Sequence, residues 1–160
     1  MSEKEVAKQM ANEMFQRGYK TSEIAKAIGK SKSTVYKYIQ EEYDLHRYPE
    51  IRTEIKMVLI QGDFEKYIRN LSFKDISLIR RRFHLWGTSK QEKIHAILKY
   101  FKSYSILGVY PEHLSRAIIK SAFRKKAKET HPDLNKHLDK SGKDFQEVHQ
   151  SYEYLLRLHA

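Results

Sequence analysis

The amino-acid sequence predicts an all-α protein. Its 160 residues include only six glycines and three prolines, whereas β-sandwiches and β-barrels need frequent turns built from these residues. Charged residues make up 32% of the chain and interleave with aliphatic positions at helical spacing. A chain of this length forms one domain or two to three very small ones, so a large catalytic fold is not expected.

Residues 3–16 are expected to form the first helix. Their apolar side chains recur at helical spacing, and Gly18 follows at a position suited to a left-handed cap. The apolar face of this helix is expected to consist of Val6, Met10, Met14 and Phe15.

Two further helices are expected before residue 47. Thr21 is placed to cap a helix over residues 21–28, which Gly29 terminates. Ser31 is placed to cap a third helix, which runs from residue 32 to about residue 42. Three short helices joined by tight turns therefore account for residues 1–47.

The third helix combines an apolar face with a polar one. Val35, Tyr38 and Ile39 share the inward face, so that hydrogen-bonding and cationic side chains project outward. A helix that enters the major groove of DNA needs this composition. The alternatives are an ordinary three-helix unit without DNA, or a variant of the same motif that binds a protein.

The segment GYKTSEIAKAIGKSKSTVYKYI resembles the helix-turn-helix of the resolvase and invertase group and of many small bacterial regulators. Ala25 fits the position where the two helices cross closely, and Gly29 fits the turn that needs positive φ. The resemblance implies a DNA-binding domain over residues 1–47. Its expected DNA contacts are Lys32, Ser33, Thr34, Tyr36, Lys37 and Gln40.

Residues 48–102 read as a basic helical connector. They carry 12 basic and 6 acidic residues, the largest excess in a chain whose net charge is +11. Such an excess favours a polyanionic partner, because cations that neutralise phosphates release counterions. The alternative is a basic surface that only keeps the protein in solution.

Helical spacing continues through the connector, with a break at Gly62 and two helices joined around residues 86–88. The pair vaguely resembles the SAP helix-extended-loop-helix module, a small DNA-binding unit, and the alternative is a plain helical spacer. Arg80, Arg81 and Arg82 are candidate DNA contacts. Because neighbours on a helix lie about 100° apart, we expect at least one of them to be structural or solvated.

The last sixty residues contain three sequence blocks. They are Leu-Gly-Val at residues 107–109, an apolar stripe that leads into His-Pro-Asp at residues 131–133, and a second apolar stripe. Proline cannot continue a helix and keeps the residue before it out of helical geometry, so the tripeptide ends its helix. The two stripes, which allow an antiparallel helix pair, are Ile119, Ala122, Phe123 and Ala127, and Phe145, Val148, Tyr152 and Leu155.

These blocks are similar to the J-domain family, the partners of DnaK-type chaperone ATPases. The resemblance implies a J-domain over residues 103–160, with an antiparallel helix hairpin. His131 and Asp133 would make the contact that activates the chaperone, and Pro132 would hold their geometry. A cationic strip for steering would consist of Lys120, Arg124, Lys125 and Lys128. Glu129 and Thr130 depart from the family pattern, which restricts docking strength.

Several classes of protein and site are not expected. The absence of cysteine excludes disulfides, thiolate zinc sites, iron–sulfur clusters and a cysteine nucleophile. The eight histidines lack metal-ligand spacing, so we expect no metal, no cofactor and no enzyme activity. No apolar run matches a signal peptide or a membrane span, which favours a cytoplasmic location and no membrane partner.

The sequence therefore predicts a DNA-associated J-domain co-chaperone. It would recruit a DnaK-type chaperone and stimulate its ATPase at a nucleoprotein complex of replication or transcription. Its further partners would be a DNA-bound client protein and a second copy of the chain. One alternative is a DNA-binding transcriptional regulator whose J-like domain is structural. Another is a chaperone adaptor whose helix-turn-helix binds a protein.

Overall fold

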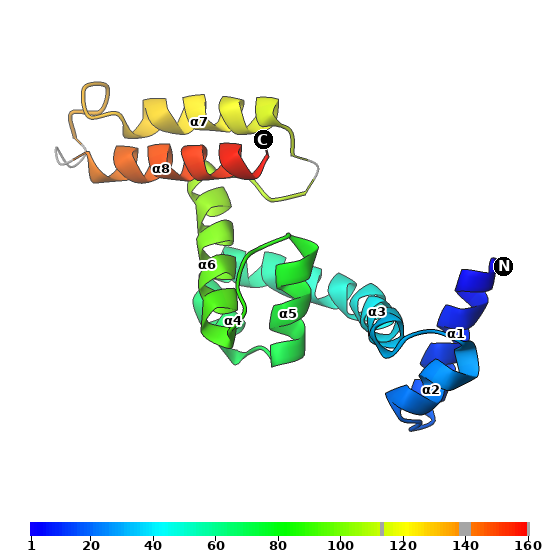
Figure 1. Cartoon of the computed structure of the whole chain (residues 1–160). Coiled ribbons are helices and arrows are strands. Elements are labelled where there is room, and N and C mark those ends of the chain that lie inside the picture. Colours follow the sequence, from blue (N-terminus) through cyan, green and yellow to red (C-terminus); the bar gives the residue numbers. More distant parts are fainter. Residues whose placement is uncertain (113, 138–141, 160) are drawn as a thin grey trace. The chain divides into compact units, whose positions relative to one another are not determined.

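The computed structural model describes residues 1–112, 114–137 and 142–159. Within these ranges the chain forms eight helices and no strand, which confirms the all-α fold (Figure 1). The chain divides into two compact units, residues 1–61 and residues 62–160. No helix of the described ranges is both long and apolar enough to span a bilayer.

The first unit contains α1 (Glu3–Gln16), α2 (Thr21–Ile28) and α3 (Lys32–Gln61). Gly18 and Gly29 follow the first two helices with φ of 87° and 64°, as predicted. The helices enclose a small core of Ala7, Ala11, Ile24, Ala25, Val35 and Tyr38.

The predicted buried face of α1 is wrong at three of its four residues, whereas Met14 is partly buried and packs against the core. Ala7 and Ala11 are the buried residues of α1, whereas Val6, Met10 and Phe15 are exposed. Small side chains let the helix backbones approach closely, and larger ones are displaced to the edges of the contact. The size of the neighbours in space, which periodicity does not report, decides which face is buried.

The predicted cap of α2 is also wrong. Thr21 is the first helical residue, and Lys20 is the N-cap. The backbone N–H of Lys20 donates to the Glu23 carboxylate at 2.7 Å, so a glutamate three residues into the helix satisfies this end.

α3 extends nineteen residues beyond the predicted end near Glu42 and passes through Pro49. Arg47 forms ion pairs with Glu50 at 2.7 Å and with Glu54 at 3.2 Å, which span the proline. These pairs favour the helix across a residue that lacks a backbone donor. The expected boundary at residue 47 therefore lies inside a helix.

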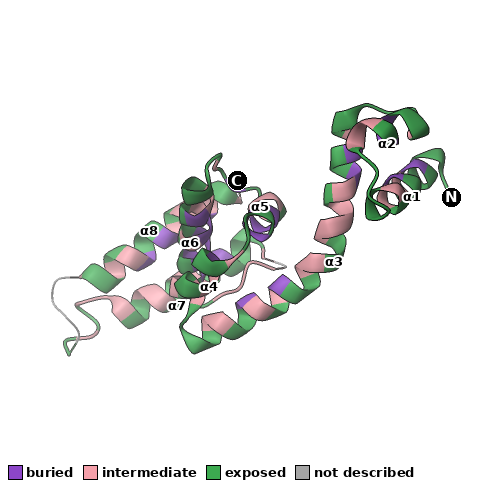
Figure 2. Cartoon of the chain, turned by 90° about the horizontal axis from the view of Figure 1, so that it is seen from below, coloured by how far each residue is buried: buried purple, intermediate pink, exposed green. Residues whose placement is uncertain are grey.

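The described residues of the second unit form five helices, and the other four pack around α6 (Lys90–Leu107). α6 packs at one end against α4 (Phe64–Asn70) and α5 (Phe73–Arg82), and at the other against α7 (Arg116–Thr130) and α8 (Lys143–Leu158) (Figure 1). Buried residues follow α5 and the length of α6 (Figure 2).

The expected boundary at residue 102 also lies inside a helix, because α6 is continuous across it. Phe101 packs against Phe64 and Phe83, with ring centroids 5.1 and 5.3 Å away. One turn later, the Tyr104 hydroxyl lies 2.6 Å from Nε2 of His159, beyond the end of α8. The residues that precede Gly108 in the C-terminal region are thus the end of an 18-residue helix, the first part of which belongs to the connector.

Candidate functional site

α7 and α8 lie side by side and antiparallel (Figure 1). Ile119 of α7 and Leu155 of α8 are fully buried, and the rings of Phe123 and Tyr152 stack with centroids 4.0 Å apart. The two predicted apolar stripes therefore form the contact, which confirms the helix hairpin. The opposite face of α7 remains exposed to solvent.

His131 ends α7 and begins a tight turn. Its backbone N–H closes the last helical bond to Ala127, whereas its φ of −66° and ψ of 125° leave helical geometry. The backbone N–H groups of Leu134 and Asn135 then donate to the His131 carbonyl at 3.2 and 3.1 Å. The tripeptide at residues 131–133 is thereby held at the tip of α7, as its proline predicts.

Asn135 closes the end of α7 with its side chain. Its Nδ2 donates to the carbonyl oxygens of Lys128, at 2.7 Å, and of His131, at 3.1 Å. These carbonyls belong to the helix end, where intrahelical donors run out. The asparagine thus fixes the backbone that carries the tripeptide. Sequence reasoning missed this role, although Asn shortly after a proline is a turn signal.

The His131 ring has a defined orientation and proton position. The backbone N–H of Asp133 donates to Nδ1 of His131 at 3.2 Å. Because Nδ1 accepts this bond, the neutral ring carries its proton on Nε2, which is left as a donor. The ring also packs edge-on against Phe145 of α8, with centroids 5.1 Å apart. The Asp133 carboxylate beside it is 90% exposed.

Pro132 lies near Gly142, at the start of α8. A Cβ on Gly142 would lie 3.6 Å from Cγ of the proline ring, which is ordinary packing distance. Gly142 itself has a φ of 67°, a conformation that favours glycine. Phe145 contacts the tip from the second helix, a contribution that the sequence motif alone does not reveal.

The four cations predicted as a strip all lie on the exposed face of α7. Lys120, Arg124 and Lys128 recur every four residues and lead toward His131, and Lys125 lies beside this line. Lys126 is separate, because it pairs with Glu129 at 2.9 Å and thereby lowers the pKa of that exposed carboxyl. The cationic strip is thus continuous with the tripeptide.

The predicted DNA contacts gather in the first three turns of α3. Five of the six are exposed, namely Lys32, Ser33, Tyr36, Lys37 and Gln40. Thr34 is half-buried and lies 2.9 Å, hydroxyl to hydroxyl, from Ser31, which also accepts from the Thr34 backbone. The exposed residues occupy the face opposite Val35 and Tyr38, so α3 presents a polar surface with two cations.

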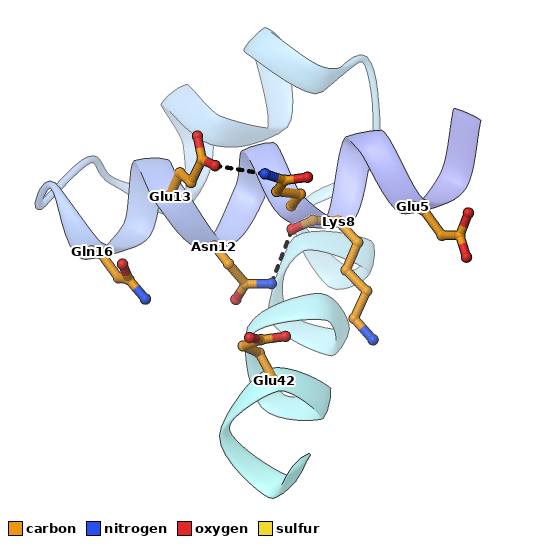
Figure 3. Close-up of a pocket in the computed structure, with 7 residues that line it drawn as sticks. Glu5, Lys8, Asn12, Glu13, Gln16 and Glu42 are labelled. Atoms are coloured by element: carbon orange, nitrogen blue, oxygen red, sulfur yellow. Dashed lines mark hydrogen bonds between the residues drawn. The ribbon is translucent and has the colours of Figure 1, made fainter. Parts of the chain in front are cut away.

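A different face of the first unit is acidic. A shallow hollow of about 300 Å³ lies between α1 and α3 (Figure 3). Its walls carry the carboxylates of Glu5, Glu13 and Glu42, whereas Lys8, the cation of its lining, pairs with Glu41 at 2.9 Å. This face would repel phosphate. Among the described residues, no group of side chains could hold a metal ion.

The family of DnaJ domains matches residues 102–158, which hold the end of α6, the tripeptide turn, α7 and α8. Residues 102–158 are a DnaJ domain. The chain is also 40% identical over 52 residues to the chaperone protein DnaJ of Synechococcus elongatus. This match covers 32% of the chain and spans 18% of the length of that relative.

The segment before the DnaJ domain has a separate similarity. Residues 6–57 match the family described as the putative ATPase subunit of terminase (gpP-like). This family differs from the resolvases and invertases that the sequence pattern resembles, and the match is consistent with a DNA-associated region. No solved structure matches the chain.

The three arginines that precede the DnaJ domain have different surroundings. Arg80 is half-buried, and its Nη1 donates to the Leu85 carbonyl at 3.2 Å. Arg82 is exposed, and Arg81 is intermediate. The expectation that at least one is structural is confirmed by Arg80. All three belong to the second compact unit, whereas the candidate contacts of α3 belong to the first.

Proposed function

We propose that this chain is a co-chaperone whose DnaJ domain recruits a DnaK-type chaperone and stimulates its ATPase. The observation that carries the proposal is the turn at residues 131–133. It presents an oriented imidazole and an exposed carboxylate on a braced backbone, at the end of a cationic helix. Groups that are already oriented lose little conformational freedom on docking, which favours affinity.

The proposed roles of the cationic strip, His131 and Asp133 follow from the exposure of these side chains to solvent. The cationic strip would attract an acidic surface of the chaperone and set its register, because long-range charge acts mainly on encounter. His131 would then donate from Nε2, and Asp133 would offer its carboxylate to a cationic or N–H group of the chaperone. ATP would be hydrolysed on the chaperone, so the chain itself would need no cofactor and would not be an enzyme.

Single-turnover hydrolysis of ATP by a DnaK-type chaperone, with and without the chain, tests this proposal. We expect the chain to accelerate hydrolysis. Absence of acceleration with several chaperones of this type, including that of the source cell, would contradict the proposed activity.

Replacing strip cations should slow docking. For Arg124→Glu/Lys128→Glu we expect about a tenfold or greater loss in association rate with the chaperone at low salt, and a much smaller difference at 1 M salt, where charges are screened within about 3 Å. Stopped-flow fluorescence with a labelled chaperone measures the rate. The matched control is Lys102→Glu/Arg157→Glu, which reverses two exposed cations outside the strip. Equal losses in both variants would assign the effect to net charge instead.

We further propose that the first unit places the DnaJ domain on DNA. The support is the polar, cationic face of α3, the acidic character of the hollow beside α1, and the similarity to a terminase subunit family. Tethering would raise the local concentration of the chaperone near DNA-bound clients, without tight affinity for each client. Replication initiators or transcriptional repressors would be suitable clients, in the cytoplasm. A second copy of the chain would supply a second half-site.

Two changes on α3 should remove specific DNA binding. We expect Ser33→Ala/Lys37→Ala to lose about 5- to 150-fold in affinity for the preferred duplex, since a specific base contact contributes about 1–3 kcal/mol. Selection from random duplexes followed by fluorescence anisotropy at fixed salt measures this. Lys4→Ala/Gln16→Ala, exposed positions of α1, serves as the control. An unchanged sequence preference in the α3 variant would contradict the assignment.

The alternative of a DNA-binding regulator with a structural DnaJ domain makes a different prediction. In that case His131→Gln would leave the biological activity intact. The fixed orientation of His131 beside an exposed carboxylate favours the co-chaperone, because groups that are already oriented lose little freedom on docking.

A further inference from the structure

Trp86, the chain's single tryptophan, is 91% exposed in the loop between α5 and α6. Its neighbours are fixed. Leu85 is buried. The backbone of Gly87 lies so close to α6 that a Cβ at this position would stand 2.8 Å from the backbone nitrogen of Lys93. The loop thus holds a large aromatic ring in water on an anchored backbone. Burial of an indole would be favourable, so a fixed, exposed one is a candidate contact.

The ring stands at the edge of a shallow hollow of about 650 Å³. The remaining walls are Gly87, Thr88, Gln91, Glu92, His95 and Ala96. A flat ring system could enter between the indole and α6, with Gln91 and His95 available for hydrogen bonds. The size falls within the range of sites that hold small, largely apolar groups.

Cations concentrate at the two helix ends that this loop joins. Between Asp75 and Glu112 the chain has seven basic residues, and its sole acid is Glu92. The Arg80 guanidinium is bonded to the carbonyl of Leu85, directly before Trp86. At the other end of the loop, the Lys93 ammonium lies 3.1 Å from the Ser77 hydroxyl and 4.3 Å above the exposed ring of Phe73.

These cations lie near enough to repel one another. Burial lowers the pKa of Lys93, and the charges of Arg80 and Arg81 lower it further. The Lys93 ammonium lies against a hydroxyl and an aromatic ring, and neither group carries a charge. A polyanion at this surface would relieve the repulsion.

We propose that Trp86 and the cations around the α5–α6 loop form a site for single-stranded nucleic acid, in which an unstacked base lies on the indole and phosphates follow the cations. Aromatic rings beside a basic surface are the usual means of binding single strands. In a duplex the base faces are occupied by neighbouring pairs, so an exposed loop tryptophan has nothing on which to stack. The proposal concerns a surface separate from α3 and from the tripeptide.

The chemistry of the hollow favours a base over an acidic peptide. Glu92 accepts hydrogen bonds from Thr88 and Ser89, which lower its pKa to about 2, so its carboxylate stays charged. A carboxylate or a phosphate would be repelled inside the hollow, whereas a neutral base with N–H groups would not. The phosphates would therefore remain outside it, at the cations.

The single tryptophan provides a local readout in the full chain. We titrate the protein with a 16-nucleotide oligothymidine and follow indole fluorescence. We expect saturable quenching that weakens with salt, and quenching of the same size in Ser33→Ala/Lys37→Ala, which separates this site from the proposed DNA face of α3. A duplex of equal length should quench little. Absent quenching, or equal quenching by the duplex or by oligoglutamate, would overturn the proposal.

Anisotropy of the labelled oligothymidine then tests the stacking contact. We expect Trp86→Ala to weaken binding about 5- to 150-fold, the value of one stacked base, and Trp86→Phe to restore much of the affinity. Phe15→Ala, which removes an exposed ring from the first unit, is the matched control and should bind as the unaltered chain. Unchanged affinity in Trp86→Ala would refute the role of the indole.

Discussion

His131→Gln is expected to abolish the stimulation of ATP hydrolysis while leaving the fold intact. The imidazole accepts from the Asp133 backbone through Nδ1 and packs against Phe145, which leaves Nε2 as the donor proposed to contact the chaperone. A glutamine side chain cannot accept from the Asp133 backbone, pack against Phe145 and donate from the position of Nε2 all at once, because it has no ring and its amide lies on a flexible chain. Loss of a central docking contact removes about 2 kcal/mol or more, so docking should weaken about 30-fold or more.

The measurement is single-turnover ATP hydrolysis by a DnaK-type chaperone, with circular dichroism to confirm the helix content of the variant. His149→Gln is the matched control, since it makes the same change at an exposed position of α8 in the DnaJ domain. We expect it to stimulate like the unaltered chain. Full stimulation by His131→Gln would contradict the proposed role of the tripeptide and favour the regulator.

The largest expected effect on stability comes from Phe101→Ala. Phe101 is 1% exposed, and its ring meets those of Phe64, Phe83 and Tyr100 within 5.3 Å between centroids. Truncating a buried phenylalanine costs about 3–5 kcal/mol, from lost burial and the cavity left behind. A domain is typically stable by about 5–15 kcal/mol, so the second unit should become marginal.

Because α6 belongs to both the connector and the DnaJ domain, the loss of stability in Phe101→Ala should affect both regions. We expect amide hydrogen exchange to accelerate together in α5 and α8, although Phe101 lies outside the tripeptide turn. Chemical denaturation followed by circular dichroism gives the free energy of unfolding. Phe15→Ala, at an exposed position, should change it by less than about 0.5 kcal/mol. Unaltered protection of α8 in Phe101→Ala would show that the two regions unfold independently.

Local signals account for what could be predicted. Gly18, Gly29 and Gly108 end helices with positive φ, where a side chain would be strained, so a glycine at the end of a periodic segment marks the end of a helix. The apolar stripes of α7 and α8, and the proline after His131, depend on spacing within a few turns. The helix pair and the exposure of the four cations on α7 were therefore predictable from spacing, and the DnaJ domain from its resemblance to the family.

Two of the expected domain boundaries fall inside helices, for another reason. α3 continues beyond its expected end near Glu42 and passes through Pro49, which ion pairs from Arg47 span. No glycine or proline interrupts α6 between Ser89 and Gly108, so the helix expected after residues 86–88 continues into the DnaJ domain as one helix.

By itself the sequence determined the helical class, most helix ends, the tripeptide and the sign of the charge, because each depends on the chemistry of neighbours along the chain. The tertiary structure alone decided that Ala7 and Ala11 are buried rather than Val6 and Met10, that Asn135 and Phe145 brace His131, and that Trp86 faces water. These outcomes depend on which side chains meet across helices, since close packing selects shapes and distances that no single helix contains.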